Sequence, residues 1–280
     1  MTLFHAVIYG VAQGLTSFLP VSSTAHLRII QALIDPHYTD RANRAGFTAF
    51  TDVIQLGTAL ALVLYFWREL LHISVAWARG LLDPSVRRSL EYRLGWYLIL
   101  ATIPVAVIGL AVDPRIETGG RNLWLIAGSL IGLALLLLVA EFTGSRAREE
   151  EDISRVDAVV VGAAQVVALV PGVSRSGVTI TAGLFRGMTR EAAARFSFLL
   201  SIPAVVLSAG YNARKFGADG APGAGLTGVA LVLSFVIGLA SIGWLLRYLS
   251  NHTTYLFIGY RLTLGALLVV LLSTGALAAT

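Results

Sequence analysis

Long apolar runs alternate with short polar segments along most of this 280-residue chain. From about Phe47 onward the runs become regular, and each is close to the roughly 20 residues that a helix needs to cross a bilayer. The pattern therefore predicts an all-α polytopic membrane protein. Its predicted spans are 47–66, 94–112, 122–142, 194–212, 225–246 and 254–277.

Two further apolar regions are interrupted. Residues 1–30 have enough apolar length for one span, but Gly10 and Pro20 break the run and a series of hydroxyl side chains follows. Residues 158–187 are broken in the same way by the turn that begins at Pro171. Irregular backbone persists at membrane depth only where protein buries it or where it lines a cavity. We therefore expect each region to form a re-entrant hairpin of two short helices.

The order of these elements repeats. Each hairpin is followed by three predicted spans, which divides a single integral membrane domain into repeats of about 1–144 and 156–280. A short sequence parallel agrees with this division, because an Ala-Gln pair ending at Gln13 precedes the first turn and another ending at Gln165 precedes the second. A hairpin returns the chain to the side that it left, whereas three spans carry it across. The two repeats are therefore expected to have inverted topology, with their broken helices meeting near the midplane.

Composition narrows the functional classes. The chain is 56% hydrophobic and only 13% charged, against roughly 25% charged residues in a typical soluble domain. Although the net charge is +5, the basic residues are scattered between apolar runs, so we do not expect nucleic-acid binding. Cysteine is absent, which excludes disulfides, thiolate metal sites and a cysteine nucleophile.

Arginines are distributed unevenly among the connections. The segments 67–93 and 143–157 and the turn at Arg247 carry more of them than the connections expected on the opposite side. Positive residues favour the cytoplasmic side of a membrane. This bias places the arginine-rich side in the cytoplasm and both termini outside.

The turn that follows Pro171 carries the first candidate chemistry. Arg175 lies there among hydroxyls, and an arginine inside a membrane is by default a functional residue. Its planar fork matches phosphate oxygens, and the start of a helix adds backbone N–H groups and a favourable dipole. We therefore predict a phosphate-binding site whose other members are Ser174, Ser176, Gly177 and Thr179.

The first turn supplies further groups. Ser22, Ser23 and Thr24 are hydroxyls, and His26 is the group in this turn that can exchange protons near neutral pH. Ser23 and His26 are three residues apart and would share a helical face. Two mechanisms remain open: a serine nucleophile with a base, or a histidine that activates water or protonates the leaving group. We expect the two turns to form one phosphate-handling site, with Ser23, His26 and Arg175 catalytic.

Several segments also resemble a known family. The sequence from Gln13 to Leu27 is similar to the first signature of the bacterial undecaprenyl-diphosphatases, also called bacitracin-resistance proteins. Further similar segments follow in order over nearly the whole chain, at Val53–Gly57, Pro171–Ile180 and Phe196–Pro203.

This resemblance implies removal of the terminal phosphate from undecaprenyl diphosphate, which gives the monophosphate lipid carrier that cell-wall synthesis reuses. It implies a site that opens toward the outer face of the bacterial plasma (inner) membrane. It also implies that the family's serine and histidine correspond to Ser23 and His26, and its phosphate-binding arginine to Arg175.

The resemblance further implies a divalent cation such as Mg²⁺ or Ca²⁺. The family's first motif commonly carries two glutamates, which in this chain are Gln13 and Ser17. Because neither side chain can act as an anionic ligand or a general base, the sequence leaves the metal ligands unassigned. Asp52 is the nearest unusual carboxylate, and we hypothesise that it partly substitutes. Gln13, Ser17, Asp52, Gln55 and Gln165 are accordingly expected to support the site.

An alternative function from a different class is a transporter or flippase for a phosphorylated polyprenyl lipid, because inverted repeats with broken helices are also a transporter plan. A transporter needs no serine-histidine pair, so Ser23 and His26 favour the enzyme. Either function implies a polyprenyl diphosphate or related lipid and the surrounding membrane lipids as partners. The sequence leaves a homodimer open.

Overall fold

The computed structural model describes residues 1–34, 44–119, 122–212 and 222–278, and the regular elements in these ranges are helices. Five of the helices are long and apolar enough to cross a membrane, which confirms a polytopic α-helical membrane protein. Their apolar stretches correspond to five of the six predicted spans. They are Gly46–Tyr65, Leu90–Ala111, Leu123–Thr143, Ala224–Asn251 and Tyr255–Ser273.

The chain order is as follows: α1 (Leu3–Thr16), α2 (Ser23–Ile34), α3 (Arg44–Tyr65), α4 (Trp67–Leu82), the 3-10 turn η2 (Pro84–Arg88), α5 (Leu90–Gly119), α6 (Leu123–Thr143), the 3-10 turn η3 (Glu150–Asp152), α7 (Arg155–Val167), α8 (Arg175–Phe185), α9 (Arg190–Asn212), α10 (Ala224–Asn251) and α11 (Tyr255–Ser273).

Two of these helices differ from the sequence expectation. The sixth predicted span, 194–212, lies in α9, which is helical but is not among the five long apolar helices. The segment 67–93, expected to be a loop, instead contains α4, η2 and the first turn of α5. The apolar and polar residues of α4 alternate with helical periodicity, and this amphipathic pattern predicts a helix that packs on one face rather than one that crosses a membrane.

Two pairs of short helices occupy the positions of the predicted hairpins. The helices α1 and α2 have 14 and 12 residues, and α7 and α8 have 13 and 11. At about 1.5 Å per residue, each is shorter than the roughly 30 Å hydrocarbon core of a bilayer. The second helix of each pair, α2 or α8, begins with a serine cap. The Ser22 hydroxyl accepts from the Ala25 N–H, and the Ser174 hydroxyl accepts from the Gly177 N–H.

The first helices of the two pairs also pack in equivalent ways. A side chain at Gly10 would meet the Ala230 carbonyl oxygen of α10 at 2.6 Å, and one at Gly162 would meet the Ala101 carbonyl oxygen of α5 at the same distance. Only glycine permits such close approach of two helices. The N-caps of α1 and α7 are Thr2 and Ser154. The pairs Thr2 and Ser154, Gly10 and Gly162, Gln13 and Gln165, and Ser22 and Ser174 are each 152 residues apart.

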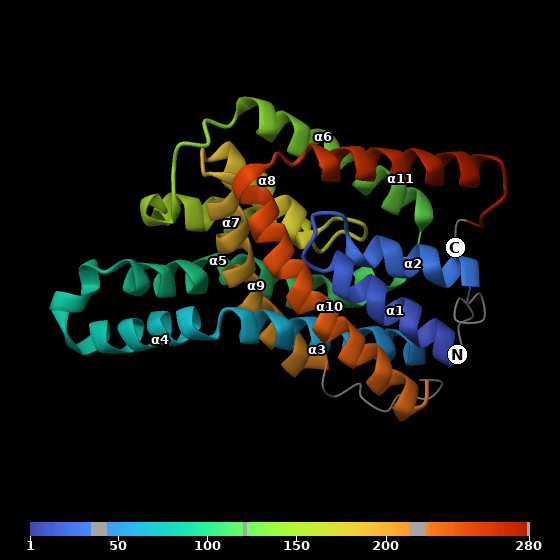
Figure 1. Cartoon of the computed structure of the whole chain (residues 1–280), viewed down its shortest axis with the longest axis horizontal. Coiled ribbons are helices and arrows are strands. Elements are labelled where there is room, and N and C mark those ends of the chain that lie inside the picture. The colour runs from blue at the N-terminus through green and yellow to red at the C-terminus, as the bar shows by residue number, and fades with distance from the viewer. Residues whose placement is uncertain (35–43, 120–121, 213–221, 279–280) are drawn as a thin grey trace.

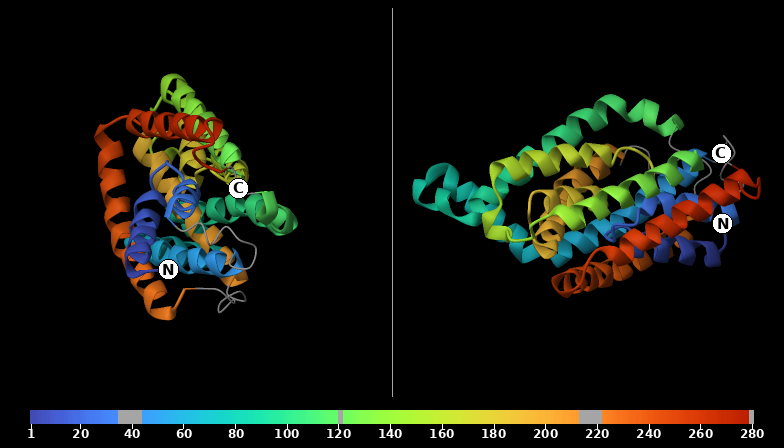
Figure 2. Two further views of the ribbon diagram at one scale, coloured as in Figure 1. Left: turned by 90° about the vertical axis from the view of Figure 1, so that its right-hand side faces the viewer. Right: turned by 90° about the horizontal axis from the view of Figure 1, so that it is seen from above.

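The helices form an elongated bundle (Figures 1 and 2). Helix α1 lies along α10, α7 lies along α5, and α6 pairs with α11. Helix α8 lies in the interior between α6, α7 and α9, and every residue from Ser176 to Leu184 is buried. The hairpin of α4 and the first part of α5 projects at one end of the long axis, and α1 begins at the opposite end (Figure 1).

Candidate active site

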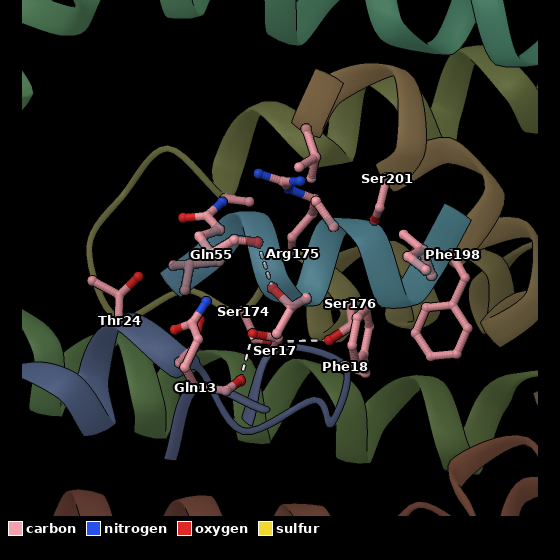
Figure 3. A pocket seen from close by; sticks show the side chains of 17 residues that line it. Gln13, Ser17, Phe18, Thr24, Gln55, Ser174, Arg175, Ser176, Phe198 and Ser201 are labelled. Carbon is pink, nitrogen blue, oxygen red and sulfur yellow. Dashed lines mark hydrogen bonds between the residues drawn. The ribbon is translucent and has the colours of Figure 1, made fainter. Parts of the chain in front are cut away.

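The two broken turns border one cavity of about 190 Å³. Helices α1, α2, α3, α8 and α9 all contribute to its wall, so it joins parts of the chain that are far apart in sequence (Figure 3). The side chains that line it are Gln13, Ser17, Phe18, Ser23, Thr24, Gln55, Thr58, Ala59, Leu62, Ala168, Val173, Ser174, Arg175, Ser176, Phe198, Ser201 and Val205.

A hydrogen bond joins the two turns directly. The hydroxyl of Ser176 donates to the carbonyl oxygen of Leu19 at 3.2 Å, and it lies 3.0 Å from the hydroxyl of Ser174. The turn before α2 is therefore attached to the first turn of α8, as the sequence analysis expected. Eight of the predicted site residues line the cavity together, namely Gln13, Ser17, Ser23, Thr24, Gln55, Ser174, Arg175 and Ser176.

Polar groups without partners face this cavity. Within the described part of the chain, neither the Arg175 guanidinium nor the Ser23 hydroxyl makes a hydrogen bond or ion pair. The Oε1 atom of Gln13 is buried and also lacks a hydrogen-bond partner. Buried polar groups normally have partners, so this combination of a cation, a hydroxyl and an amide is suited to an anionic ligand that supplies the missing contacts.

His26 is not among the cavity residues. Its Nδ1 lies 2.7 Å from the carbonyl oxygen of Ser22, and its Nε2 lies 2.5 Å from the hydroxyl of Tyr260. A carbonyl oxygen can only accept, so Nδ1 donates to it, and in the neutral imidazole Nε2 accepts from the Tyr260 hydroxyl. The His26 and Tyr260 rings are stacked with centroids 5.6 Å apart. His26 therefore faces α11, whereas Ser23 faces the cavity, and no hydrogen bond among the described residues joins the two side chains.

The remaining predicted phosphate ligands are engaged within the protein. Ser22 and Gly177 take part in the helix caps described above. The Thr179 hydroxyl donates to the Arg175 carbonyl oxygen at 2.7 Å and lies 2.6 Å from the hydroxyl of Ser197. These three residues shape the start of each helix and do not line the cavity.

Two supporting residues also lie outside the cavity lining. Gln165 in α7 is completely buried, and neither atom of its side-chain amide has a hydrogen-bond partner within the described ranges. Asp52 lies on α3 one turn before Gln55, which does line the cavity. The hypothesis that Asp52 replaces a missing carboxylate stays a prediction.

The donor set of the cavity does not fit a divalent cation held by the protein. Protein sites for Mg²⁺ and Ca²⁺ rely on carboxylates, whereas no acidic side chain lines the cavity. Its neutral oxygen ligands are hydroxyls and two glutamine amide carbonyls, and they lie beside a positively charged guanidinium. Elsewhere in the described ranges, no group of three or more histidine and acidic residues gathers in a metal-binding arrangement.

Arg261 is a further polar group near the site, and it was not among the site residues predicted from the sequence. It is completely buried in α11. Its guanidinium donates to the carbonyl oxygens of Leu130 at 3.2 Å, Ser129 at 3.1 Å and Pro20 at 3.1 Å. It thereby fastens the first broken turn to α6 and α11. An arginine inside an apolar run is a sequence signal for a buried polar contact. The sequence could not identify the contact, because the backbone partners of Arg261 lie more than a hundred residues away.

Comparisons with known proteins agree with the sequence resemblance. The family model described as bacitracin resistance protein BacA matches residues 6–267. An undecaprenyl-diphosphatase of Mycobacterium sp. (strain KMS) is 47% identical over 283 residues, covering 100% of both chains. The undecaprenyl-diphosphatases of Mycolicibacterium gilvum (strain PYR-GCK) and Mycobacterium bovis (strain ATCC BAA-935 / AF2122/97) are 46% and 45% identical, again with 100% of both chains covered.

Proposed function

We infer that this chain, which belongs to the bacitracin resistance protein BacA family, is an undecaprenyl-diphosphatase. It dephosphorylates undecaprenyl diphosphate to undecaprenyl phosphate and inorganic phosphate, which returns the lipid carrier to cell-wall synthesis and confers bacitracin resistance. Full-length identity of 44–47% to relatives that carry this name favours the enzyme over the transporter considered above. The observation that carries the chemistry is the convergence of Ser23 and Arg175 on one cavity.

We propose that Arg175 binds the terminal phosphate of the substrate. Its guanidinium lies at the start of α8, where backbone N–H groups and the helix dipole also favour an anion. During hydrolysis, the bond between the terminal phosphorus and the bridging oxygen breaks, and the negative charge on the phosphoryl oxygens must be stabilised. A cation fixed in a cavity with few waters is effective at this. Ser174, Ser176 and Gln13 would supply further hydrogen bonds.

The attacking group is a separate proposal. The Ser23 hydroxyl lines the cavity and has no partner of its own within the described ranges, so it is free to attack phosphorus or to orient a water molecule. His26 would act indirectly, through the backbone next to Ser23, and not on the substrate itself. It supports the carbonyl of Ser22, the residue before Ser23, and Tyr260 holds its ring in place. We therefore propose a positioning role for His26.

We propose that the protein itself provides no carboxylate ligand for Mg²⁺ or Ca²⁺ in this cavity. Gln13 and Ser17 occupy the two positions at which the first motif of the family commonly has glutamates. The Ser17 hydroxyl donates to the backbone carbonyl oxygen of Gln13 at 2.6 Å. Binding of the diphosphate then depends on Arg175 and neutral donors. Added cations are expected to have little effect on the wild-type activity.

We also propose that the two halves are inverted repeats that together form the site. Three observations support this: the 152-residue spacing of the caps, glycines and glutamines in the two hairpins, the equivalent glycine contacts of α1 with α10 and of α7 with α5, and the pairing of α6 with α11. In this arrangement α9 would cross the membrane as α3 does. The arginine bias would place the arginine-rich side in the cytoplasm and both termini outside, and the family resemblance implies a site that opens toward the outer face of the plasma membrane.

The test is the release of inorganic phosphate from undecaprenyl diphosphate by the purified protein in detergent. We expect Arg175→Ala to lower kcat by about 100-fold to 1000-fold, the usual effect of removing one group that stabilises transition-state charge, and Ser23→Ala to reduce it strongly. His26→Ala should reduce kcat less than Ser23→Ala. The matched control is Ser201→Ala, because Ser201 lines the same cavity but its hydroxyl donates to the Ser197 carbonyl oxygen.

The same assay tests the metal proposal. Wild-type turnover should be similar in EDTA, Mg²⁺ and Ca²⁺, whereas Ser17→Glu, which restores a carboxylate in the cavity, should make turnover respond to the cation. Loss of wild-type turnover in EDTA would contradict the metal proposal without affecting the phosphatase assignment. Folded wild-type protein that releases no phosphate in any of these conditions would contradict the assignment itself.

A further inference from the structure

A second cavity, of about 460 Å³, lies between the projecting hairpin and the start of α7. It is separate from the active-site cavity, and the two share no lining residue. Three of its seven lining residues are arginines and three are aromatic, but none is acidic. They are Arg87, Tyr92, Arg93, Trp96, Tyr97, Leu100 and Arg155.

None of the three guanidiniums forms a salt bridge within the described residues, although the Asp83 carboxylate interacts electrostatically with Arg87. Arg87 donates to the carbonyl oxygens of Gly80 and Leu81, and Arg93 donates to the backbone carbonyl oxygen of Glu151. The Nε of Arg93 is buried without a hydrogen-bond partner, and Arg155 is exposed and has neither a hydrogen bond nor an ion pair within the described residues. The cavity therefore carries a concentrated positive charge and unsatisfied donors, which favour an anionic ligand.

Close packing holds the aromatic wall in place. A side chain at Gly80 would meet the ring of Tyr92 at 2.3 Å, so this ring rests directly on the backbone of α4. The Trp77 and Trp96 rings are in edge contact, with centroids 5.6 Å apart. The cavity wall is consequently a preformed feature of the α4–α5 hairpin.

The cavity has a polar end and an apolar end. Arg87 precedes the apolar span Leu90–Ala111, Arg93 lies in the first turn of that span and Arg155 is the first residue of α7, whereas Leu100 lies almost three helical turns into the span. Beyond Leu100, the exposed side chains of Ile103 and Val107 continue along the same face of α5. A ligand with a charged head and an apolar tail would match this gradient from arginine to leucine.

We propose that this cavity binds the headgroup of an anionic phospholipid, with an acyl chain lying along α5. Basic pockets between membrane helices bind phosphate headgroups, and tryptophan and tyrosine are favoured at the level of those headgroups. A soluble phosphate would use the arginines but would leave the aromatic wall and the exposed stripe of α5 without a function. The combination therefore favours a lipid.

Native mass spectrometry of the full-length protein in detergent tests the proposal. The probes are phosphatidylglycerol and phosphatidylcholine with the same acyl chains. We expect wild type to retain phosphatidylglycerol in preference to phosphatidylcholine. Arg155→Gln should weaken phosphatidylglycerol binding about fivefold, the effect of one arginine near a lipid surface. The matched control Arg79→Gln removes an exposed arginine of α4 outside the cavity and should leave binding unchanged.

Arg155 is the primary variant because no described side-chain contact depends on it, so its replacement should not affect folding. Arg175→Ala serves as a second comparison and should retain phosphatidylglycerol, since its cavity is separate. Equal retention of the two lipids by wild type would overturn the proposal. So would equal effects of Arg155→Gln and Arg79→Gln, or loss of the lipid in Arg175→Ala alone.

Discussion

At the scale of single residues, the first broken turn depends on contacts from α11. Ser22 has a φ of 75°, in the left-handed region that is unfavourable for residues with a side chain. Such a conformation persists only where its surroundings enforce it. Here Arg261 donates to the Pro20 carbonyl oxygen on one side, and His26, held by Tyr260, contacts the Ser22 carbonyl oxygen on the other. Two adjacent residues of α11 therefore stabilise the turn that presents Ser23.

We predict that Arg261→Met destabilises the protein by about 3 kcal/mol, because three buried carbonyl oxygens would lose a donor at about 1 kcal/mol each. Phosphate release should also fall, since the turn before Ser23 would lose an anchor. Thermal unfolding in detergent, followed by circular dichroism, measures the first effect. Arg247→Met is the control, because Arg247 is exposed. Equal melting temperatures for the two variants would refute the anchoring role.

At the scale of helices, glycines decide which pairs can pack closely. Gly10 and Gly162 allow α1 to approach α10 and α7 to approach α5, as the distances above show. Gly14 makes a further close contact with α10, where an added side chain would meet the Cβ of Ile237 at 2.8 Å. In a membrane, small residues at an interface are a main source of helix association, because there is no hydrophobic driving force between helices.

We predict that Gly162→Ala lowers stability by about 1–3 kcal/mol, the usual cost of overpacking a tight interface. The new methyl group would lie 2.5 Å from the Ala101 Cα, and backbone cannot move aside as a flexible side chain can. Gly128→Ala is the matched control, since nothing lies within 4 Å of a side chain placed there. Thermal unfolding of both variants provides the measurement, and only Gly162→Ala should melt at a lower temperature. Unchanged stability of Gly162→Ala would mean that the interface between α7 and α5 is looser than described.

At the scale of the whole molecule, ionic clusters join helix ends at one side of the bundle. Glu141 at the end of α6 pairs with Arg146 and with Arg190 of α9. Arg195 of α9 pairs with Glu69 of α4 and with Glu150 of η3. A further cluster, centred on Asp157 of α7, contains Arg148 and Arg186, which lie 2.6 and 2.7 Å from its carboxylate oxygens. Segments far apart in sequence are thus held together at the arginine-rich side.

The Asp157 cluster should make stability depend on pH. Burial alone would raise the pKa of Asp157, but hydrogen bonds from Arg148, Ser154 and Arg186 outweigh it and hold the pKa well below its usual range. The unfolded carboxyl has a pKa of about 3.9. A depressed folded pKa stabilises the fold above that value, and this contribution is lost as the pH falls toward the folded pKa.

We therefore predict that Asp157→Asn melts below wild type at pH 7 and that the difference narrows as the pH falls from about 4 to 3. Melting curves in detergent across this range provide the measurement. Glu151→Gln removes an exposed acidic side chain from the neighbouring η3 and serves as the control, with no such narrowing expected. A difference between Asp157→Asn and wild type that is constant with pH would exclude the electrostatic explanation.

The sequence by itself determined the class of protein, five of its long apolar helices and the two broken hairpins, because apolar length and helix-breaking residues are local properties. It also indicated Ser23 and Arg175 as chemical groups. It also predicted that their two turns form one site. Only the tertiary structure decided which of the predicted residues line the cavity, that His26 turns instead to Tyr260, and that Arg261 anchors the first turn. Each of these depends on contacts between residues more than a hundred positions apart, and on which face of a helix meets a neighbour, which helical periodicity alone does not specify.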